Sequence, residues 1–197
     1  MTITYHDLMH AARAALRAAG VDDEANKLEA QDLICAAAGK TPEQLYRDFS
    51  LYTTDAIAET IEKYMDRRLA GEPIAYIIGE WDFMGLRFFV NPAALIPRVD
   101  TEMLAQLAIS RLKEHPGHTR VLDLCAGSGC IGLAVASQVG DCRVTLGDLS
   151  EGALRICRQN IRRNGLTDRV APMQVDARKA PPRQLGTYDC ILCNPPY

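Results

Sequence analysis

The stretch VLDLCAGSG, Val121 to Gly129, decides the fold. Its first half is a short apolar run of the kind that forms a buried β-strand. Its second half turns at Gly127 and Gly129, and a helical segment, residues 129–140, follows at once. Glycines let the backbone approach a ligand closely, and a helix that begins there offers unpaired N–H groups. The stretch therefore predicts a strand, a ligand-binding turn and a helix, which are the first elements of an α/β fold.

The segments around this stretch repeat the alternation of strand and helix. Predicted strands cover residues 119–125, 142–148, 169–176 and 188–193, and predicted helices cover 129–140 and 150–165. Short apolar runs that alternate with helices indicate βαβ units and a parallel, doubly wound sheet. The fold class is therefore α/β, with the sheet in the C-terminal half.

The N-terminal part has a different pattern. Helical spacing with Gly or N-cap punctuation predicts helices at residues 6–20, 22–39, 41–49 and 53–71. Residues 72–98 are rich in aromatic and β-branched residues broken by Gly and Pro, which predicts a β-hairpin or a short extended linker. We expect a helical domain at 1–72, a hairpin linker at 73–99 and a sheet domain at 100–197. Composition does not separate a plain helical bundle from a partner-recognition domain.

Charge and cysteine content narrow the function classes. The net charge of −3 gives no global basic field that would attract nucleic acid or acidic lipid. No signal peptide and no apolar stretch long enough to span a bilayer are apparent. The seven cysteines, an odd number, lie in apolar segments and indicate reduced thiols in a cytoplasmic protein. The CxxC spacing of Cys190–Cys193 lies in a predicted buried strand, which favours apolar thiols over a metal or redox site.

Carboxylates at the ends of the predicted strands suggest what the turn binds. Asp148 ends the next strand, where a carboxylate accepts hydrogen bonds from ribose hydroxyls. Leu133 stands where a dinucleotide motif has its third glycine, so a single nucleoside is favoured, and S-adenosyl-L-methionine fits. Asp123 is then a partner for the ammonium group of the methionine end, and Asp176 for the adenine amine. The glycines alone are also compatible with a tight turn that binds nothing, and Asp148 makes that alternative weaker.

The motif NPPY follows the last predicted strand, at the edge where doubly wound sheets bind ligands. Pro195 and Pro196 fix φ and carry no N–H, so the segment presents hydrogen-bond acceptors. The Asn194 side-chain oxygen and the Pro195 carbonyl suit the two hydrogens of a planar –NH2 group, on which Tyr197 would stack. Such positioning can lower a barrier by about 7–11 kcal/mol. Alone, the motif favours a plain turn after a strand; combined with the glycine turn and Asp148 in this order, it favours an acceptor site.

These motifs resemble class I S-adenosylmethionine-dependent methyltransferases, and more narrowly the HemK/PrmC family. That family methylates the glutamine side-chain amide in the Gly-Gly-Gln loop of class I peptide chain release factors. The resemblance is carried by residues 67–90, 95–102, 122–136 and 194–197. It implies a helical domain that recognises the release factor, a hairpin linker and a Rossmann-like catalytic domain, with no membrane partner.

The resemblance also implies site residues. The cofactor contacts carried over are Cys125, Ala126, Gly127, Ser128, Gly129, Asp148, Asp176 and Ala177, and Asn194 is the amide-binding residue. The family usually has glycine at Cys125, a bulkier residue at Ala177 and proline at Val99, so we expect altered packing around the cofactor. Its sheet also needs about three further strands. We therefore expect a C-terminally truncated domain with an open sheet edge.

Two other functions remain open. An adenine-N6 methyltransferase would use the same acceptor motif, but it needs base flipping and a basic groove, which the acidic balance disfavours. A non-catalytic fragment that binds a release factor or the ribosome through its helical half is the second alternative. Binding of S-adenosylmethionine separates the enzymes from the binding fragment.

Overall fold

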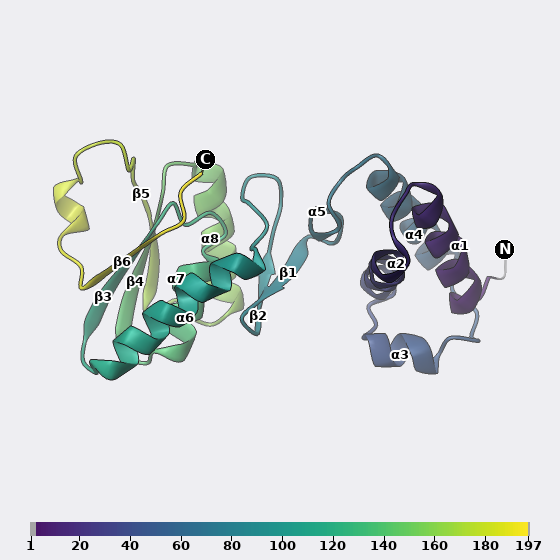
Figure 1. Ribbon diagram of the computed structural model, residues 1–197, viewed down its shortest axis with the longest axis horizontal. Helices are drawn as coiled ribbons and strands as arrows, with labels where there is room; N and C mark the ends of the chain where they lie inside the picture. The colour runs from purple at the N-terminus through teal and green to yellow at the C-terminus, as the bar shows by residue number, and fades with distance from the viewer. Residues whose placement is uncertain (1–2, 197) are drawn as a thin grey trace. The chain divides into compact units, whose positions relative to one another are not determined.

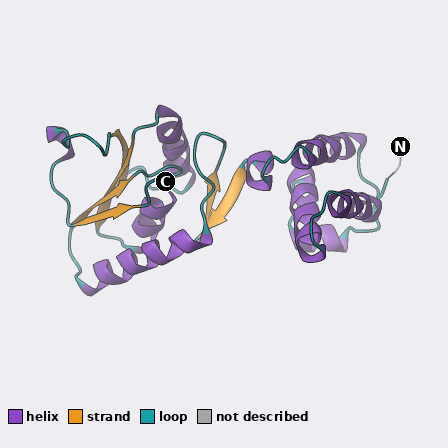
Figure 2. Ribbon diagram, turned by 45° about the horizontal axis from the view of Figure 1, so that its top comes forward, coloured by secondary structure: helices purple, strands orange, loops and turns teal. Residues whose placement is uncertain are grey.

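The computed structural model describes residues 3–196, which fall into two compact units, 3–78 and 79–196. The first unit is built from helices, and the second contains both β-sheets (Figure 2). The second unit has the expected α/β class, with a Rossmann-like parallel sheet. No helix within residues 3–196 is both long and apolar enough to cross a bilayer.

The helical unit follows its sequence punctuation closely. Its elements are α1 (Tyr5–Ala18), α2 (Asp23–Ala38), α3 (Pro42–Arg47), α4 (Asp55–Leu69) and α5 (Ile74–Ile78). Thr4, Asp22, Thr41 and Thr54 cap the first four helices through side-chain oxygens, and Gly39 ends α2 in a left-handed conformation, φ 62°. The caps satisfy backbone N–H groups that have no partner within the helix.

Apolar faces of these helices form one core. Its fully buried members include Leu16, Leu33, Ile34 and Leu45. A two-pronged ion pair joins α4 to α2, with Arg68 Nε 2.8 Å from Glu29 Oε2 and Arg68 Nη2 3.0 Å from Oε1. Both side chains are about one-fifth exposed, so this pair is partly shielded from water.

Helix α5 differs from the expected linker. The segment expected to begin the hairpin is helical from Ile74 to Ile78, and Ile77 is buried in the helical core. The boundary between the two units lies between Ile78 and Gly79. The run IAYII is too short to show a helical period, so its β-branched content favoured strand. The division into a recognition domain, a linker and a catalytic domain stays a prediction.

The hairpin itself consists of β1 (Glu80–Phe83) and β2 (Leu86–Phe89), paired antiparallel. Met84 and Gly85 form its two-residue turn with φ 49° and 77°, the left-handed pair that hairpins favour. The Met84 N–H donates to Glu102 Oε1 at 3.4 Å, so the turn is linked to helix α6 (Val99–Glu114).

The main sheet is parallel throughout, in the order β5-β4-β3-β6 (Figure 1). Its strands are β3 (Thr119–Leu124), β4 (Cys142–Asp148), β5 (Val170–Gln174) and β6 (Cys190–Cys193). Helix α7 (Cys130–Gln138) connects β3 to β4, α8 (Glu151–Arg163) connects β4 to β5, and the 3-10 turn η1 (Arg183–Leu185) precedes β6. The chain thus reverses direction across the sheet between β3 and β6, a switch point where such sheets bind ligands.

Within residues 3–196, α7 and α8 pack on the same face of the sheet. A Cβ on Gly132 of α7 would lie 2.4 Å from Leu146, and one on Gly129 would lie 2.8 Å from Leu146 and 3.4 Å from Cys157 of α8. The opposite face carries a small cluster of Leu122, Val175 and Leu185. Among the described residues, helices therefore cover one face rather than the two that a doubly wound sheet implies.

Strand β5 is an edge strand that contains a proline. The Val144 N–H bonds to the Arg169 carbonyl, and the Val175 N–H bonds to the Asp148 carbonyl. Residues 169 and 175 thus direct their polar groups toward β4, and with alternation Pro172 directs its own outward. The missing N–H of Pro172 costs no bond within the sheet, which explains why the strand tolerates it.

Candidate active site

The predicted binding turn lies at the carboxyl edge of the sheet, between β3 and α7. Cys125, Gly127 and Gly129 all have left-handed φ, at 64°, 57° and 80°. Gly129 is also the N-cap of α7, where no other side chain fits against Leu146. Cys125 adopts a conformation that glycine takes without strain, which gives a physical reason for the glycine expected there from the family resemblance.

Asp148 lies at the end of β4, where the sequence placed a ribose acceptor. Its Oδ2 accepts the Gly127 N–H at 2.8 Å, and its Oδ1 accepts the Ser150 N–H at 2.9 Å. The half-buried carboxylate thus fixes the turn to the adjacent strand. Each oxygen has a second lone-pair direction, so the group can accept further hydrogen bonds.

Asp123 is fully buried beneath the same turn. Its Oδ2 accepts the Gly132 N–H at 2.8 Å, whereas its Oδ1 has no hydrogen-bond partner. Burial raises the pKa of this carboxyl to about 7, and the negative charge of Asp148 adds to the rise. The Ser128 hydroxyl is also buried without a partner. Buried polar atoms are normally hydrogen-bonded, so this pair is suited to a polar ligand.

Asp176 and Ala177 follow β5, but their surroundings differ from the expectation. The Asp176 carboxylate accepts the Arg178 Nε–H at 3.0 Å and an Arg178 Nη2–H at 3.2 Å. Hydrogen bonding to this side chain lowers the pKa of Asp176. An adenine amine would therefore share this acceptor with a guanidinium. Ala177 is exposed.

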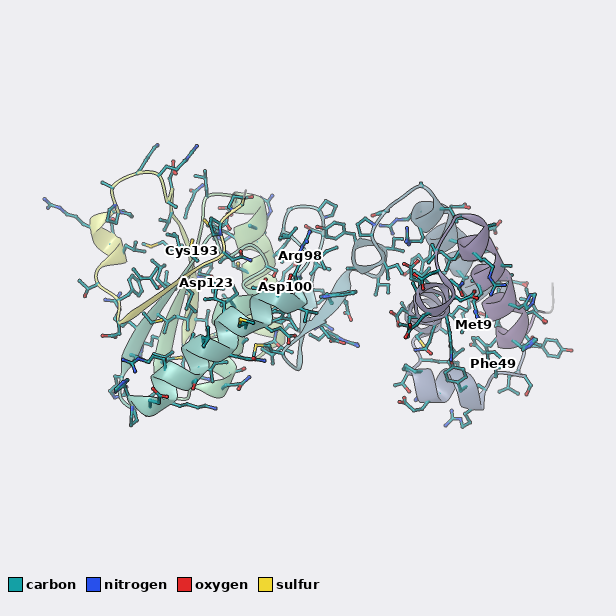
Figure 3. All side chains as sticks on the ribbon, viewed as in Figure 1. Met9, Phe49, Arg98, Asp100, Asp123 and Cys193 are labelled. Atoms are coloured by element: carbon teal, nitrogen blue, oxygen red, sulfur yellow. The ribbon has the colours of Figure 1, made fainter. Side chains whose placement is uncertain are left out.

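The acceptor motif lies at the end of β6, next to the turn that follows β3. Asn194, Pro195 and Pro196 are exposed, and Tyr197 lies outside the described residues. The Asn194 Nδ2 donates to the Thr101 hydroxyl of α6 at 3.3 Å. This bond uses one of the two N–H groups of the amide and leaves Oδ1 available as an acceptor. Figure 3 shows this edge, with Asp123 and Cys193 labelled on the sheet and Arg98 and Asp100 at the start of α6.

Two residues of this site were missed by the sequence analysis. Thr101 lies in a segment quoted for the family resemblance, but its hydroxyl gave no sign of a partner at the far end of the chain. Asn160 of α8 is fully buried, and its amide bonds to both backbone groups of Phe89 and to the Ser128 carbonyl at 2.9 Å. An asparagine in an amphipathic helix is usually expected on the exposed face. The one signal for burial was its position among the apolar residues Ile156, Cys157 and Ile161.

The interpretation of Cys190–Cys193 as buried thiols is wrong for Cys193, which is exposed, whereas Cys190 is half-buried. Within residues 3–196, β6 borders the sheet, so only Leu192 of this run is fully covered. All seven cysteines are free thiols in the structure.

Comparison with known proteins supports a single family. Residues 7–79 match the PrmC N-terminal domain, and residues 97–197 match the methyltransferase small domain. The chain belongs to the HemK/PrmC family of methyltransferases. A release factor glutamine methyltransferase of Nitratidesulfovibrio vulgaris is 36% identical over 98% of this chain and 64% of its own length. One from Moorella thermoacetica is 38% identical over 92% of this chain and 62% of its own.

The chain thus spans a little under two thirds of the length of these HemK/PrmC relatives. Among solved structures, the human methyltransferase 10 domain containing protein covers 59% of this chain with 56% of its own, at 21% sequence identity and a TM-score of 0.48.

Proposed function

We propose that the protein transfers a methyl group from S-adenosylmethionine to the side-chain amide nitrogen of the glutamine in the Gly-Gly-Gln loop of a class I peptide chain release factor, in the cytoplasm. One observation carries the proposal: the Asn194 amide is oriented by Thr101, with its oxygen as acceptor, beside the glycine turn. The names of the relatives support the choice of substrate.

The residues around the turn suit the cofactor. The Asp148 carboxylate would accept the ribose hydroxyls, and the unpartnered oxygens of Asp123 and Ser128 would receive the ammonium group. The space beside the Gly127 backbone is open, since a Cβ there would meet nothing within 4 Å, so a ligand can come close to the turn. S-adenosylmethionine supplies a methyl group on a sulfonium, which leaves as a neutral thioether.

The acceptor residues supply orientation rather than proton transfer. An amide nitrogen is a poor nucleophile because its lone pair is delocalised. The Asn194 Oδ1 and the Pro195 carbonyl would accept its two N–H groups and direct the nitrogen at the methyl carbon. Neither proline has an N–H, so the two prolines add no backbone donor beside these acceptors. The gain comes from holding two reactants in a productive geometry.

The direct test is methylation of a purified release factor, read by peptide mass spectrometry with the chain and S-adenosylmethionine. We expect a methyl group on the loop glutamine and none when that glutamine is replaced. Asn194→Ala should abolish transfer while cofactor affinity is kept, and Thr101→Val should slow transfer more than Thr101→Ser. Cofactor binding without glutamine methylation would redirect the assignment to adenine in nucleic acid, and absence of binding would favour the non-catalytic alternative.

A further inference from the structure

Two cysteines meet where the glycine turn and the acceptor motif come together. Leu124 and Cys193 are register partners on the adjacent parallel strands β3 and β6, and Cys125 is the next residue after Leu124. With strands about 4.8 Å apart and a rise of about 3.3 Å per residue, the Cα atoms of Cys125 and Cys193 lie about 6 Å apart. Disulfides bridge Cα separations of about 4.4–6.8 Å.

The two thiols also interact. Burial, together with the neighbouring Cys193 thiol and a hydrogen bond between the two side chains, raises the pKa of Cys125 to about 11. Cys125 is half-buried and Cys193 is exposed. An oxidant can therefore reach Cys193 first, with a second thiol already beside it.

The other thiols lack this geometry. Cys190 and Cys193 are three residues apart on one strand, so they face opposite sides of the sheet at a distance of about 10 Å. The remaining four, Cys35, Cys130, Cys142 and Cys157, are buried. The CxxC spacing is thus a coincidence of sequence, and the close pair is formed across two strands.

Cys125 is also conformationally unusual. It is one of two non-glycine residues with positive φ among the described residues, and the other, Met84, is in a hairpin turn. A left-handed conformation is sterically unfavourable for a residue that has a side chain. Residues with a strained backbone cluster at functional sites, so the conformation of Cys125 is consistent with a functional thiol.

We propose that Cys125 and Cys193 are a redox pair that hydrogen peroxide converts to a disulfide. The exposed Cys193 sulfur attacks the peroxide, whose O–O bond breaks to give a sulfenic acid and one water. The Cys125 sulfur then displaces the sulfenic oxygen, which leaves as a second water after taking the Cys125 proton. In total two S–H bonds are lost, one S–S bond forms and the peroxide accepts two electrons.

The bridge would join the first residue of the glycine turn to the residue that precedes Asn194. One consequence rests on the proposed function: if S-adenosylmethionine binds over this turn, saturating cofactor should slow the closure. The bridge itself depends only on the two thiols, so the two ideas can fail separately.

The test uses the reduced chain, treated with a small excess of hydrogen peroxide, blocked with N-ethylmaleimide and digested without reductant. We expect a peptide pair linked through Cys125 and Cys193, lighter by two hydrogens and reversed by dithiothreitol. The matched variant Cys190→Ser should retain the linked pair, whereas Cys193→Ser and Cys125→Gly should lose it. Cys190→Ser and Cys193→Ser both replace a thiol on β6, so a link lost only in Cys193→Ser is specific to the Cys193 thiol.

A linked pair in wild type and Cys190→Ser supports the proposal. A Cys190–Cys193 link, a link between two chains, or a Cys193 that proceeds to sulfinic acid without a link overturns it. The same digestion with saturating S-adenosylmethionine reports on the cofactor site. Closure that is unaffected by cofactor argues against binding at this turn and leaves the redox pair intact.

Discussion

Asn160 holds Phe89 through both of its backbone hydrogen-bonding groups. The Phe89 N–H donates to Asn160 Oδ1 at 2.7 Å, and Asn160 Nδ2 donates to the Phe89 carbonyl at 3.1 Å. The side-chain amide thus substitutes for a neighbouring strand at the edge of β2. Because the same Nδ2 donates to the Ser128 carbonyl, one buried side chain joins the hairpin to the glycine turn.

Asn160→Ala should therefore affect both stability and cofactor affinity. It leaves backbone groups of Phe89 and Ser128 without this partner, at a cost of roughly 1–3 kcal/mol in unfolding free energy for each group that water does not reach. Loss of one bond to the turn, about 1 kcal/mol, corresponds to about fivefold weaker binding of S-adenosylmethionine. Denaturant unfolding and calorimetric titration measure the two effects.

Asn164→Ala is the matched control for Asn160→Ala. Asn164 is the C-cap residue that directly follows α8, and it donates to the Arg87 carbonyl of the hairpin at 3.2 Å, with no bond to the turn. It should lose some stability and keep its cofactor affinity. Equal affinities for the two variants would show that Asn160 supports the hairpin alone.

Cys125→Gly should stabilise the protein by about 1 kcal/mol, because glycine adopts φ 64° without the steric cost that a Cβ imposes. Part of this gain is offset by the greater freedom of glycine in the unfolded chain. The same substitution at Cys190, inside a strand, should destabilise the protein. The urea midpoints of the two variants should move in opposite directions, and a downward shift for Cys125→Gly would show that the thiol contributes more than its strain costs.

Asp123 should make stability depend on pH in an unusual direction. Burial raises its pKa from 3.8 to about 7, so the folded state favours the uncharged acid. The stability from this group is fully present below pH of about 4 and is lost as the pH rises to about 7. Asp123→Asn should therefore gain stability relative to wild type across this window, measured by denaturation midpoints.

Asp176→Asn should change the pH dependence of stability in the opposite direction to Asp123→Asn. The Arg178 side chain lowers the pKa of Asp176, so its contribution is present at neutral pH and is lost as the pH falls through that lowered value. Parallel stability curves for wild type and Asp123→Asn would indicate that the buried carboxyl keeps an ordinary pKa.

In the helical unit, Arg68→Ala should destabilise by about 1 kcal/mol, because it leaves the partly buried Glu29 carboxylate without its two-pronged partner. Arg17→Ala breaks a pair whose side chains are 61% and 75% exposed, so it should destabilise the protein much less than Arg68→Ala. Hydrogen exchange of α2 amides reads the difference within this unit. Equal protection in both variants would contradict the prediction.

The sequence predicted the elements that local signals determine. The N-cap at Thr41 and the terminal Gly39 marked where α3 begins and α2 ends, and the alternation after residue 116 predicted the four parallel strands. These signals act within a few residues of the chain, so reading them requires no knowledge of the fold.

What escaped prediction depends on long-range contacts. Asn160 and Phe89 are 71 residues apart, and Thr101 and Asn194 are 93 apart, so no periodicity connects them. The exposure of Cys193 depends on β6 being an edge strand, which strand order decides. The left-handed φ of Cys125 was similarly hidden, because a cysteine gives no local sign of a glycine-like conformation.

Pro172 has a consequence for how the sheet can grow. At the β5 edge of the sheet, the outward-facing Pro172 has no N–H. A strand added beside β5 would therefore lack one of its backbone hydrogen bonds. The other border, β6, contains no proline and exposes Ile191 to 62%. Extension of the described sheet is therefore one-sided: any additional strand, from this polypeptide or from another, should join next to the thiols and the acceptor asparagine.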